Sequence, residues 1–207
     1  RRALRRGTLN NSLVPVVCGA ALRKIGIQPL LDTIVSYLPS PADMPSVEGT
    51  HPETQEVQVR EPDSNAPFCA LAFKVAIDPY VGRLVYIRVY SGQMKAGAMV
   101  FNSTKEKRER IGRMVRMHAN HREEVAEVST GHIGAVVGLK NTFTGDTICV
   151  ETAPVILEPP QFPEPVISVS VEPRTRSDQE KLEDGLRKFA EEDPTFLVRY
   201  DKETGQT

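Results

Sequence analysis

A run of basic side chains is the feature of this sequence with the most specific potential chemistry. Between positions 105 and 116 six cations stand against two carboxylates, in a chain of 207 residues whose net charge is −1. The cations are Lys105, Lys107, Arg108, Arg110, Arg113 and Arg116. In an extended strand Lys105 and Lys107 would share one face, and Arg108 and Arg110 the other. This pattern fits either a solvated hairpin or contact with a polyanionic backbone. No aromatic residue interrupts it, so phosphate contact is favoured over base stacking.

The histidines and cysteines do not predict a site. His118 and His121 have the spacing of two neighbouring metal ligands, but no third ligand lies near them in the sequence, so no metal site is expected. The three cysteines each stand in an apolar run, which predicts buried, reduced thiols: Cys18, Cys69 and Cys149. No serine stands in a nucleophile turn, and no catalytic residue is predicted.

The chain also lacks the loop that would hold a nucleotide's phosphates. Gly92 and Gly97 have the right spacing, but Ala98 stands where the loop needs lysine. In such loops the backbone amides and the lysine hold the phosphates, and a hydroxyl holds Mg²⁺. We therefore predict that this chain alone is not an enzyme and binds no cofactor or metal.

Composition indicates a globular protein. Apolar residues make up 40 % and charged residues 26 %, and lysine plus arginine (26) nearly equal aspartate plus glutamate (27). This balance excludes a whole-chain attraction to nucleic acid or to membranes. No stretch approaches the length of a membrane span, and the N-terminus carries neither methionine nor an apolar signal core. We expect a cytoplasmic protein without membrane contact.

Two proline-rich segments, 39–67 and 154–165, divide the chain into three parts. The block between them alternates short apolar runs with turn signals, as in a closed or nearly closed β-barrel. The expected strands cover 68–77, 84–90, 98–101, 111–117, 125–128, 133–139 and 147–150. The sequence therefore predicts a mainly β protein around a central barrel.

The two flanks mix strand and helix patterns. The first predicts a buried strand at 14–18 and an amphipathic helix at 27–38, as at the end of a larger α/β domain. The second predicts strands at 166–171 and 195–200 around a helix at 178–191. Ser177 and Glu180 have the spacing of a capping box at the start of that helix.

The flanking strands are expected to seek partners. We predict that 166–171 and 195–200 pair with each other, and that the helix covers them with Leu182, Leu186 and Phe189. Because unpaired strand edges recruit other chains, we also expect self-association through these edges, without a biological role.

Long motifs in all three parts resemble the elongation factor G family of bacterial translation. They are Val14-Pro15-Val16-Val17-Cys18-Gly19-Ala20-Ala21-Leu22, then residues 26–32, 37–41, 82–84 and 88–92, then Met117-His118-Ala119-Asn120, and finally 122–125, 136–141, 144–147, 168–173 and 190–196. They follow in family order and spacing over nearly the whole chain. Departures from the family pattern include His121, where lysine is common, and His132, where an acidic residue is common.

The resemblance implies a domain organisation that agrees with the proline-rich cuts. It predicts the end of a GTPase domain, a linker, the second-domain β-barrel, a second linker, and the first half of a ferredoxin-like third domain (βαβ). The corresponding ranges are 1–43, 44–65, 66–153, 154–163 and 164–207.

The resemblance also implies a function. Family members use GTP and Mg²⁺ to drive tRNA and mRNA through the ribosome. Their second domain rests on small-subunit ribosomal RNA, and their third lies near a small-subunit protein. For this chain that implies ribosome binding and coupling between domains, but not hydrolysis. The alternatives are part of another translational GTPase, such as a ribosomal-protection or release-step factor, or a stand-alone barrel that binds RNA or protein.

Two sets of site residues follow from the resemblance. A family loop that contacts the guanine base through its backbone maps to Gly19, Ala20 and Ala21, with Ala20 in place of the usual serine. The expected RNA contacts are the basic hairpin residues and one arginine before it: Arg83, Lys105, Lys107, Arg108, Arg110 and Arg113.

Overall fold

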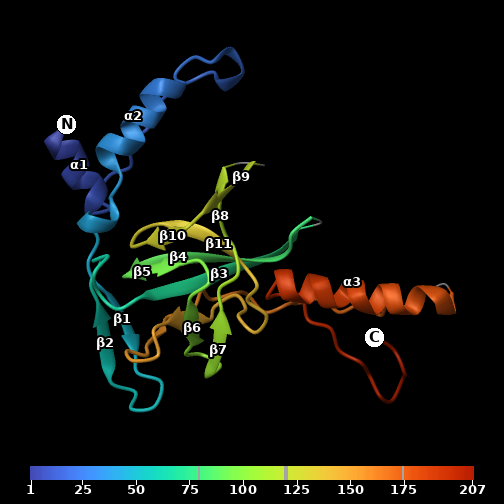
Figure 1. Cartoon of the computed structure of the whole chain (residues 1–207). Coiled ribbons are helices and arrows are strands. Elements are labelled where there is room, and N and C mark those ends of the chain that lie inside the picture. The colour runs from blue at the N-terminus through green and yellow to red at the C-terminus, as the bar shows by residue number, and fades with distance from the viewer. Residues whose placement is uncertain (79, 119–120, 174) are drawn as a thin grey trace. The chain divides into compact units, whose positions relative to one another are not determined.

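A computed structural model of the chain (Figure 1) describes residues 1–78, 80–118, 121–173 and 175–207. Residues 119 and 120 of the motif at 117–120 lie outside these ranges. The chain divides into two compact units, Arg1–Pro45 and Ser46–Thr207, and each is described by itself. None of the helices in the described ranges is both long enough and apolar enough to span a lipid bilayer.

The first unit is helical. It contains α1 (Arg2–Leu9), η1 (Ala21–Arg23), α2 (Ile27–Tyr37) and η2 (Pro41–Asp43). The Arg5 guanidinium joins its ends, because it donates to the Leu38 carbonyl at 3.3 Å and to the Asp43 carboxylate at 2.6 Å. Hydrogen bonds from the amide and hydroxyl of Ser40, together with Arg5, lower the pKa of Asp43 to about 2.

The helix predicted at 27–38 is confirmed as α2, but the strand predicted at 14–18 is wrong. This segment has no regular structure, and Val14 and Val16 are exposed. A strand needs hydrogen-bonded neighbours, and the first unit offers none among its described residues. For the same reason Cys18, predicted to be buried, is exposed.

The second unit is built on an eight-stranded antiparallel sheet, in the order β7-β6-β12-β3-β4-β11-β8-β9. Its strands are β3 (Cys69–Asp78), β4 (Gly82–Ser91), β6 (Met99–Asn102), β7 (Lys107–Arg110), β8 (Met114–His118), β9 (His121–Val125), β11 (Ile133–Val137) and β12 (Thr147–Cys149). Strands β5 (Gln93–Lys95) and β10 (Glu127–Ser129) form a two-stranded sheet. The prediction of a mainly β protein is confirmed.

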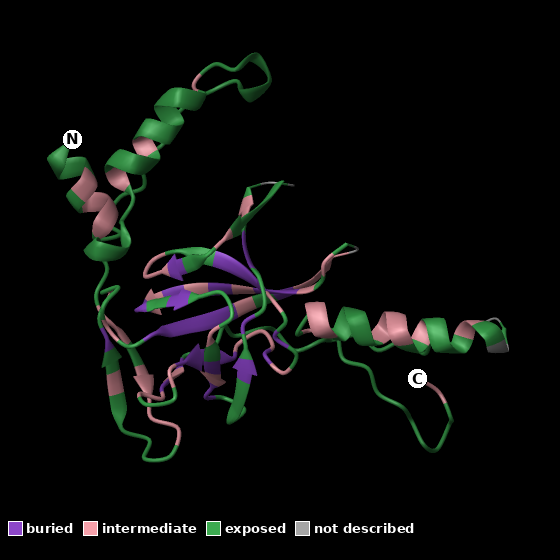
Figure 2. Cartoon of the chain, in the orientation of Figure 1, coloured by how far each residue is buried: buried purple, intermediate pink, exposed green. Residues whose placement is uncertain are grey.

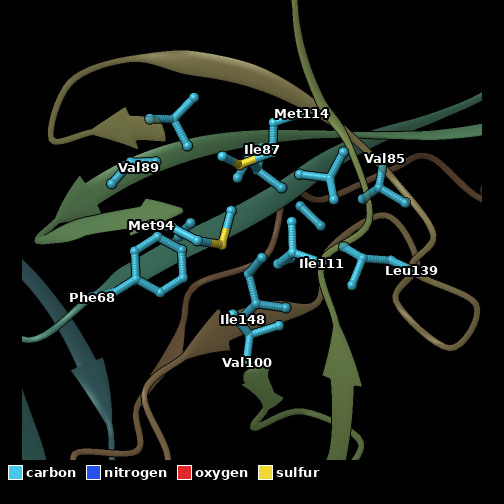
Figure 3. Packing of buried hydrophobic residues seen from close by; sticks show 14 of the residues in the cluster. Phe68, Val85, Ile87, Val89, Met94, Val100, Ile111, Met114, Leu139 and Ile148 are labelled. Carbon is cyan, nitrogen blue, oxygen red and sulfur yellow. The ribbon is translucent and has the colours of Figure 1, made fainter. Parts of the chain in front are cut away.

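The strands enclose a main apolar cluster, with two smaller clusters beside it (Figures 2 and 3). The main cluster takes side chains from both sheets, among them Val85, Ile87, Met94, Met114 and Ile148. At its rim Gly92 connects β4 to β5 with φ of +70°, and a Cβ there would lie 2.6 Å from the Ala66 carbonyl oxygen. Only glycine fits this turn without strain.

The segments predicted as linkers contain strands, which corrects the sequence analysis. Strands β1 (Val47–Thr50) and β2 (Val57–Arg60) lie within 44–65, and β13 (Ile156–Leu157) lies within 154–163. They form a three-stranded sheet in the order β13-β1-β2. The prolines flank these strands without interrupting them, so they do not remove ladder hydrogen bonds. The domain boundaries themselves stay predictions.

The C-terminal part contains η3 (Arg176–Asp178) and α3 (Gln179–Glu192). The helix is confirmed, but its N-cap is Asp178 without a side-chain cap, so the capping box is wrong. The strands predicted at 166–171 and 195–200 do not form or pair. Leu182 and Leu186 are half-buried, while Phe189 is exposed beside Phe196, with ring centroids 5.8 Å apart.

Candidate nucleic-acid interface

The basic run forms a hairpin at one edge of the eight-stranded sheet. Strand β7 pairs with β6 through residues 107–110 and is the last strand on that side. Along β7 only Glu109 is buried, whereas Lys107, Arg108 and Arg110 are exposed. The alternation therefore directs one carboxylate inward and leaves the cations at the surface.

Glu109 fastens the hairpin to the loop at 139–146. Its carboxylate accepts hydrogen bonds from the Lys140 amide at 2.7 Å, the Asn141 amide at 2.8 Å and the Thr142 hydroxyl at 2.5 Å. Burial raises the pKa of the Glu109 carboxyl, but these hydrogen bonds together outweigh burial and hold the pKa below its ordinary value. Glu109 is thus an ionised anchor beneath a cationic surface.

A second polar group closes the other end of the same loop. The Asp146 carboxylate accepts from the Phe143 amide at 2.8 Å and from the Asn102 side-chain amide at 3.0 Å. Asn102 also donates to the Thr142 hydroxyl at 3.2 Å. Asn102 and Thr142 are fully buried, and a buried polar network in which each member has partners is rigid. The loop is irregular in backbone and yet fixed in place.

Arg83 contacts the same loop, at 139–146, through its guanidinium group. Its guanidinium donates to the Leu139 carbonyl at 2.5 Å and the Thr142 carbonyl at 2.6 Å, and it forms an ion pair with Glu191 of α3 at 3.1 Å. The guanidinium carbon lies 4.7 Å from the centroid of the Phe143 ring. With only 17 % of its side chain exposed, Arg83 positions the loop and α3, and it presents little surface to a ligand.

The predicted RNA contacts differ in how free their charges are. Arg108 is bound to Glu151 through both its Nε and a terminal nitrogen, at 2.8 and 2.6 Å. The Lys105 ammonium lies 4.2 Å from the centroid of the Phe143 ring and 4.0 Å from the Asp146 carboxylate. These contacts compete with any external anion for the two cations.

Three of the predicted cations remain available. Lys107, Arg110 and Arg113 are exposed, and within the described ranges none of them forms an ion pair. Lys107 reaches Asn141 at 3.5 Å, and the Nε of Arg110 donates to the Gly97 carbonyl at 3.2 Å. We call Lys107, Arg110 and Arg113 the free cations.

Sequence reasoning missed Lys140 as a member of this surface. It is exposed, and the Glu109 carboxylate fixes its backbone next to β7. The only signal was its place inside the motif at 136–141. Its approach to the basic run depends on a contact between residues 31 positions apart, which a local charge pattern does not reveal.

The residues predicted to contact a guanine base lie in the first unit. Gly19, Ala20 and Ala21 are exposed, and the Ala20 amide donates to the Ile25 carbonyl at 2.9 Å. The loop closes tightly because Gly26 has φ of +80°, where a Cβ would lie 2.8 Å from the Cys18 carbonyl oxygen. One of the three amides is therefore already used within the loop.

The histidine pair does not gather further ligands in the described part of the chain. His118 and His121 stand opposite each other on β8 and β9. Across residues 1–78, 80–118, 121–173 and 175–207, no three side chains of the metal-binding types cluster.

Comparisons with known proteins assign names to two of the three parts. Residues 67–151 match the family model for elongation factor G domain 2, and residues 162–207 match the model for elongation factor G domain III. A curated relative from Dehalococcoides mccartyi, named Elongation factor G, is 55 % identical over all 207 residues. The chain spans 30 % of that relative's length.

A solved structure supports the same fold. A crystal structure of a Thermus thermophilus protein superposes with a TM-score of 0.77 at 26 % sequence identity. The alignment covers 99 % of this chain and 28 % of the other. The arrangement of strands and helix described above therefore also occurs in an experimentally determined protein.

Proposed function

The chain belongs to the elongation factor G family, and we propose that it supplies ribosome binding to a translocation factor. In this proposal the whole protein works in the cytoplasm, where it hydrolyses GTP with Mg²⁺ and moves tRNA and mRNA through the ribosome. Residues 66–153 act as the barrel that rests on small-subunit ribosomal RNA. Residues 164–207 belong to a third domain near a small-subunit protein.

The free cations support RNA contact most directly. They stand on or just beyond an edge strand of the barrel in a chain with almost no net charge, so their positive potential is local. Lys140 adds a fourth charge beside them. Cations that neutralise phosphates release condensed counterions, and this gives affinity without reading a base sequence. The surface therefore suits the backbone of folded RNA.

The network beneath the cations supports a rigid mode of binding. Glu109, Asn102 and Asp146 fix the loop that lies against β7, so the cations need little ordering when an anion binds. A preformed surface loses less conformational entropy on association. We propose that shape, set by this loop, complements the charge.

Coupling between domains is the second part of the proposal. Arg83 connects the loop to Glu191, and the neighbouring Glu192 carboxylate accepts a hydrogen bond from the Ile77 amide of β3. Both acidic residues lie at the C-terminal end of α3. We propose that this contact transmits the position of the third domain to the RNA-binding loop.

Nucleotide hydrolysis is assigned to other parts of the whole protein. The chain has no phosphate-binding loop, and Gly19, Ala20 and Ala21 offer an incomplete set of amides. In this proposal GTP is a substrate of the whole protein and Mg²⁺ is its metal cofactor, and both bind outside residues 1–207. Calorimetry with GDP is expected to give no micromolar binding to residues 1–207, and micromolar binding would contradict this assignment.

Sedimentation with bacterial small ribosomal subunits tests the RNA contact. Neutralising the free cations (Lys107→Gln, Arg110→Gln and Arg113→Gln together) should weaken binding and make it less salt-dependent. Each lost phosphate contact reduces the slope of log K against log salt by about 0.7–0.9. The expected loss in slope is therefore about 2 to 3.

A matched control removes three charges elsewhere. Lys181→Gln, Arg187→Gln and Lys188→Gln lie on α3, where each cation already pairs with an aspartate. This variant should bind nearly as well as the unchanged chain. Equal losses in the two variants would indicate a non-specific charge effect and would contradict the proposed interface.

A further inference from the structure

Two buried thiols face each other across neighbouring strands of the eight-stranded sheet. Cys69 on β3 and Cys149 on β12 are direct partners in the antiparallel ladder. Backbone hydrogen bonds join the pair Val150 and Phe68 at 3.1 Å and the pair Ala72 and Asp146 at 2.9 Å. Hydrogen-bonded and non-hydrogen-bonded pairs alternate along such a ladder, so the two cysteines occupy a non-hydrogen-bonded position.

That position suits a covalent link. Side chains at non-hydrogen-bonded positions point to the same face and approach most closely, with Cα atoms about 4.5 Å apart. Disulfides accept Cα separations of about 4.4–6.8 Å, so closure requires rotation of the thiols with little movement of the strands. The register therefore places two cysteines where oxidation can join them.

The three-stranded sheet covers both thiols. Cys69 and Cys149 are fully buried in a cluster that includes Val155 and Leu157, with Val47 packed against it. Burial raises the pKa of the Cys69 thiol to about 12, and it also raises the pKa of Cys149. While the cover is closed, both groups are protonated and unreactive.

A buried cation stands beside this pair. Arg60 ends β2 and is only 8 % exposed, and its guanidinium donates to the Val59 and Ala153 carbonyls at 3.1 and 3.0 Å. Its Nε has no partner, and in the described ranges no carboxylate forms an ion pair with it. Its positive charge lowers the pKa of both thiols and so opposes the effect of burial.

The three-stranded sheet that covers the thiols includes one very short strand. Strand β13 has two residues, and it pairs with β1 only at Gly49 with Leu157 and at Thr50 with Ile156. Short elements with few ladder bonds open locally at lower free energy than a core sheet. Opening of β13 would admit water and small oxidants to the thiols while Arg60 still favours the thiolate form.

We propose that Cys69 and Cys149 are a redox-sensitive dithiol that closes to a disulfide between β3 and β12 when peroxide reaches it. One thiolate attacks the peroxide oxygen, the O–O bond breaks, and a sulfenic acid forms with release of hydroxide, which takes up the proton that the thiol lost and leaves as water. The second thiolate attacks that sulfur and displaces hydroxide, which takes up a proton and leaves as water. Two thiols are oxidised, and one peroxide is reduced to two waters.

The test uses the 207-residue chain with Cys18→Ser, which removes the exposed thiol. After hydrogen peroxide treatment and alkylation in denaturant, mass spectrometry should find a loss of two hydrogens and a cross-linked peptide pair containing Cys69 and Cys149. Dithiothreitol should restore two alkylatable thiols. Cys69→Ser and Cys149→Ser should each abolish the cross-link, with unchanged circular dichroism as the folding control.

Two results would overturn the proposal. One is complete alkylation of both cysteines after peroxide treatment that oxidises free glutathione in the same tube. The other is accumulation of sulfinic acid on either cysteine without the cross-link. Arg60→Met tests the effect of the charge separately from the opening of the three-stranded sheet. In this variant the rate of disulfide formation should fall relative to the rate of amide hydrogen exchange at Leu157, which reports opening of β13. An unchanged ratio of these two rates would show that Arg60 has no part in the mechanism.

Discussion

The loop at 139–146 is more buried than its composition suggests, and the segment at 166–171 is more exposed. The loop consists mostly of polar residues and has no regular structure, yet Thr142 is fully buried and Asp146 is 5 % exposed. The segment at 166–171 is mostly β-branched and apolar, yet Val166 is 97 % exposed and Val169 76 %. Apolar character alone does not order a chain.

The difference lies in hydrogen-bond partners. Donors and acceptors of the loop meet Glu109, Arg83 and Asn102, which three different strands supply. Along 166–171 only the Val171 amide has a backbone partner among the described residues, the Thr207 carbonyl at 2.9 Å. A buried backbone without partners is expensive, so an apolar strand that lacks a neighbouring strand stays in solvent.

Removal of the Glu109 carboxylate should destabilise the loop at 139–146. Glu109→Leu leaves two amides and one hydroxyl without an acceptor in a buried site, and the unfolding free energy should fall by about 3 kcal/mol. Urea denaturation measures this change. Glu106→Gln, an exposed carboxylate of the same hairpin, is the control and should change stability by less than about 0.5 kcal/mol. Similar values for both variants would contradict the anchoring role.

Substitution of Arg83 should lower the unfolding free energy more than it weakens RNA binding. Arg83→Met retains much of the apolar stem but leaves the Leu139 and Thr142 carbonyls unpaired, so a loss of about 2 kcal/mol is expected in urea denaturation. Glu191→Gln removes only the partly exposed ion pair and should cost about 0.5 kcal/mol or less. A stable Arg83→Met chain with weakened ribosome binding would instead identify Arg83 as a direct contact.

The Glu109 anchor should also make stability depend on pH. Its folded pKa lies below the ordinary 4.5, so its contribution is complete above that value and is lost as the pH falls through the lower folded pKa. Between about pH 5 and 3, stability should therefore fall more steeply in the unchanged chain than in Glu109→Gln. Equal slopes in urea titrations of the two proteins would show that folding does not lower the pKa of Glu109, and would contradict its role as an ionised anchor.

The exposed segment should tolerate change. Val169→Ser alters a side chain without packing partners, so its effect on the unfolding free energy should stay within about 0.5 kcal/mol. If self-association through this segment occurs, light scattering at high concentration should show less of it in the variant. A large loss of stability would show that the segment is packed in solution and would remove the contrast with the loop.

Some strands contain too few apolar residues to be predicted from an apolar pattern. Strand β9 consists mostly of charged and polar residues, and β7 contains no apolar residue at all. Apolar periodicity found β3, β4, β6, β8, β10, β11 and β12, with boundaries shifted by up to three residues. In the same block it missed β5, β7 and β9, because their places are set by pairing with β10, β6 and β8.

The candidate site was predicted only in part for a similar reason. The basic run and its position on a hairpin followed from local sequence. Which cations stay free did not, because Glu151 pairs with Arg108 and Glu191 pairs with Arg83, and both partners are distant in the sequence. Lys140 joins the surface through Glu109, another long-range contact.

Local sequence was sufficient to predict the mainly β class, most of the strands between residues 68 and 150, the helices expected at 27–38 and 178–191, and the match to the elongation factor G family. These depend on periodicity and on motifs, which are local properties. The folded chain was needed to see that the proline-rich segments form a third sheet, that the flanking apolar segments stay unpaired, and which charges are neutralised. Strand pairing and ion pairing join distant residues, so each residue's surroundings are fixed only when the chain has folded.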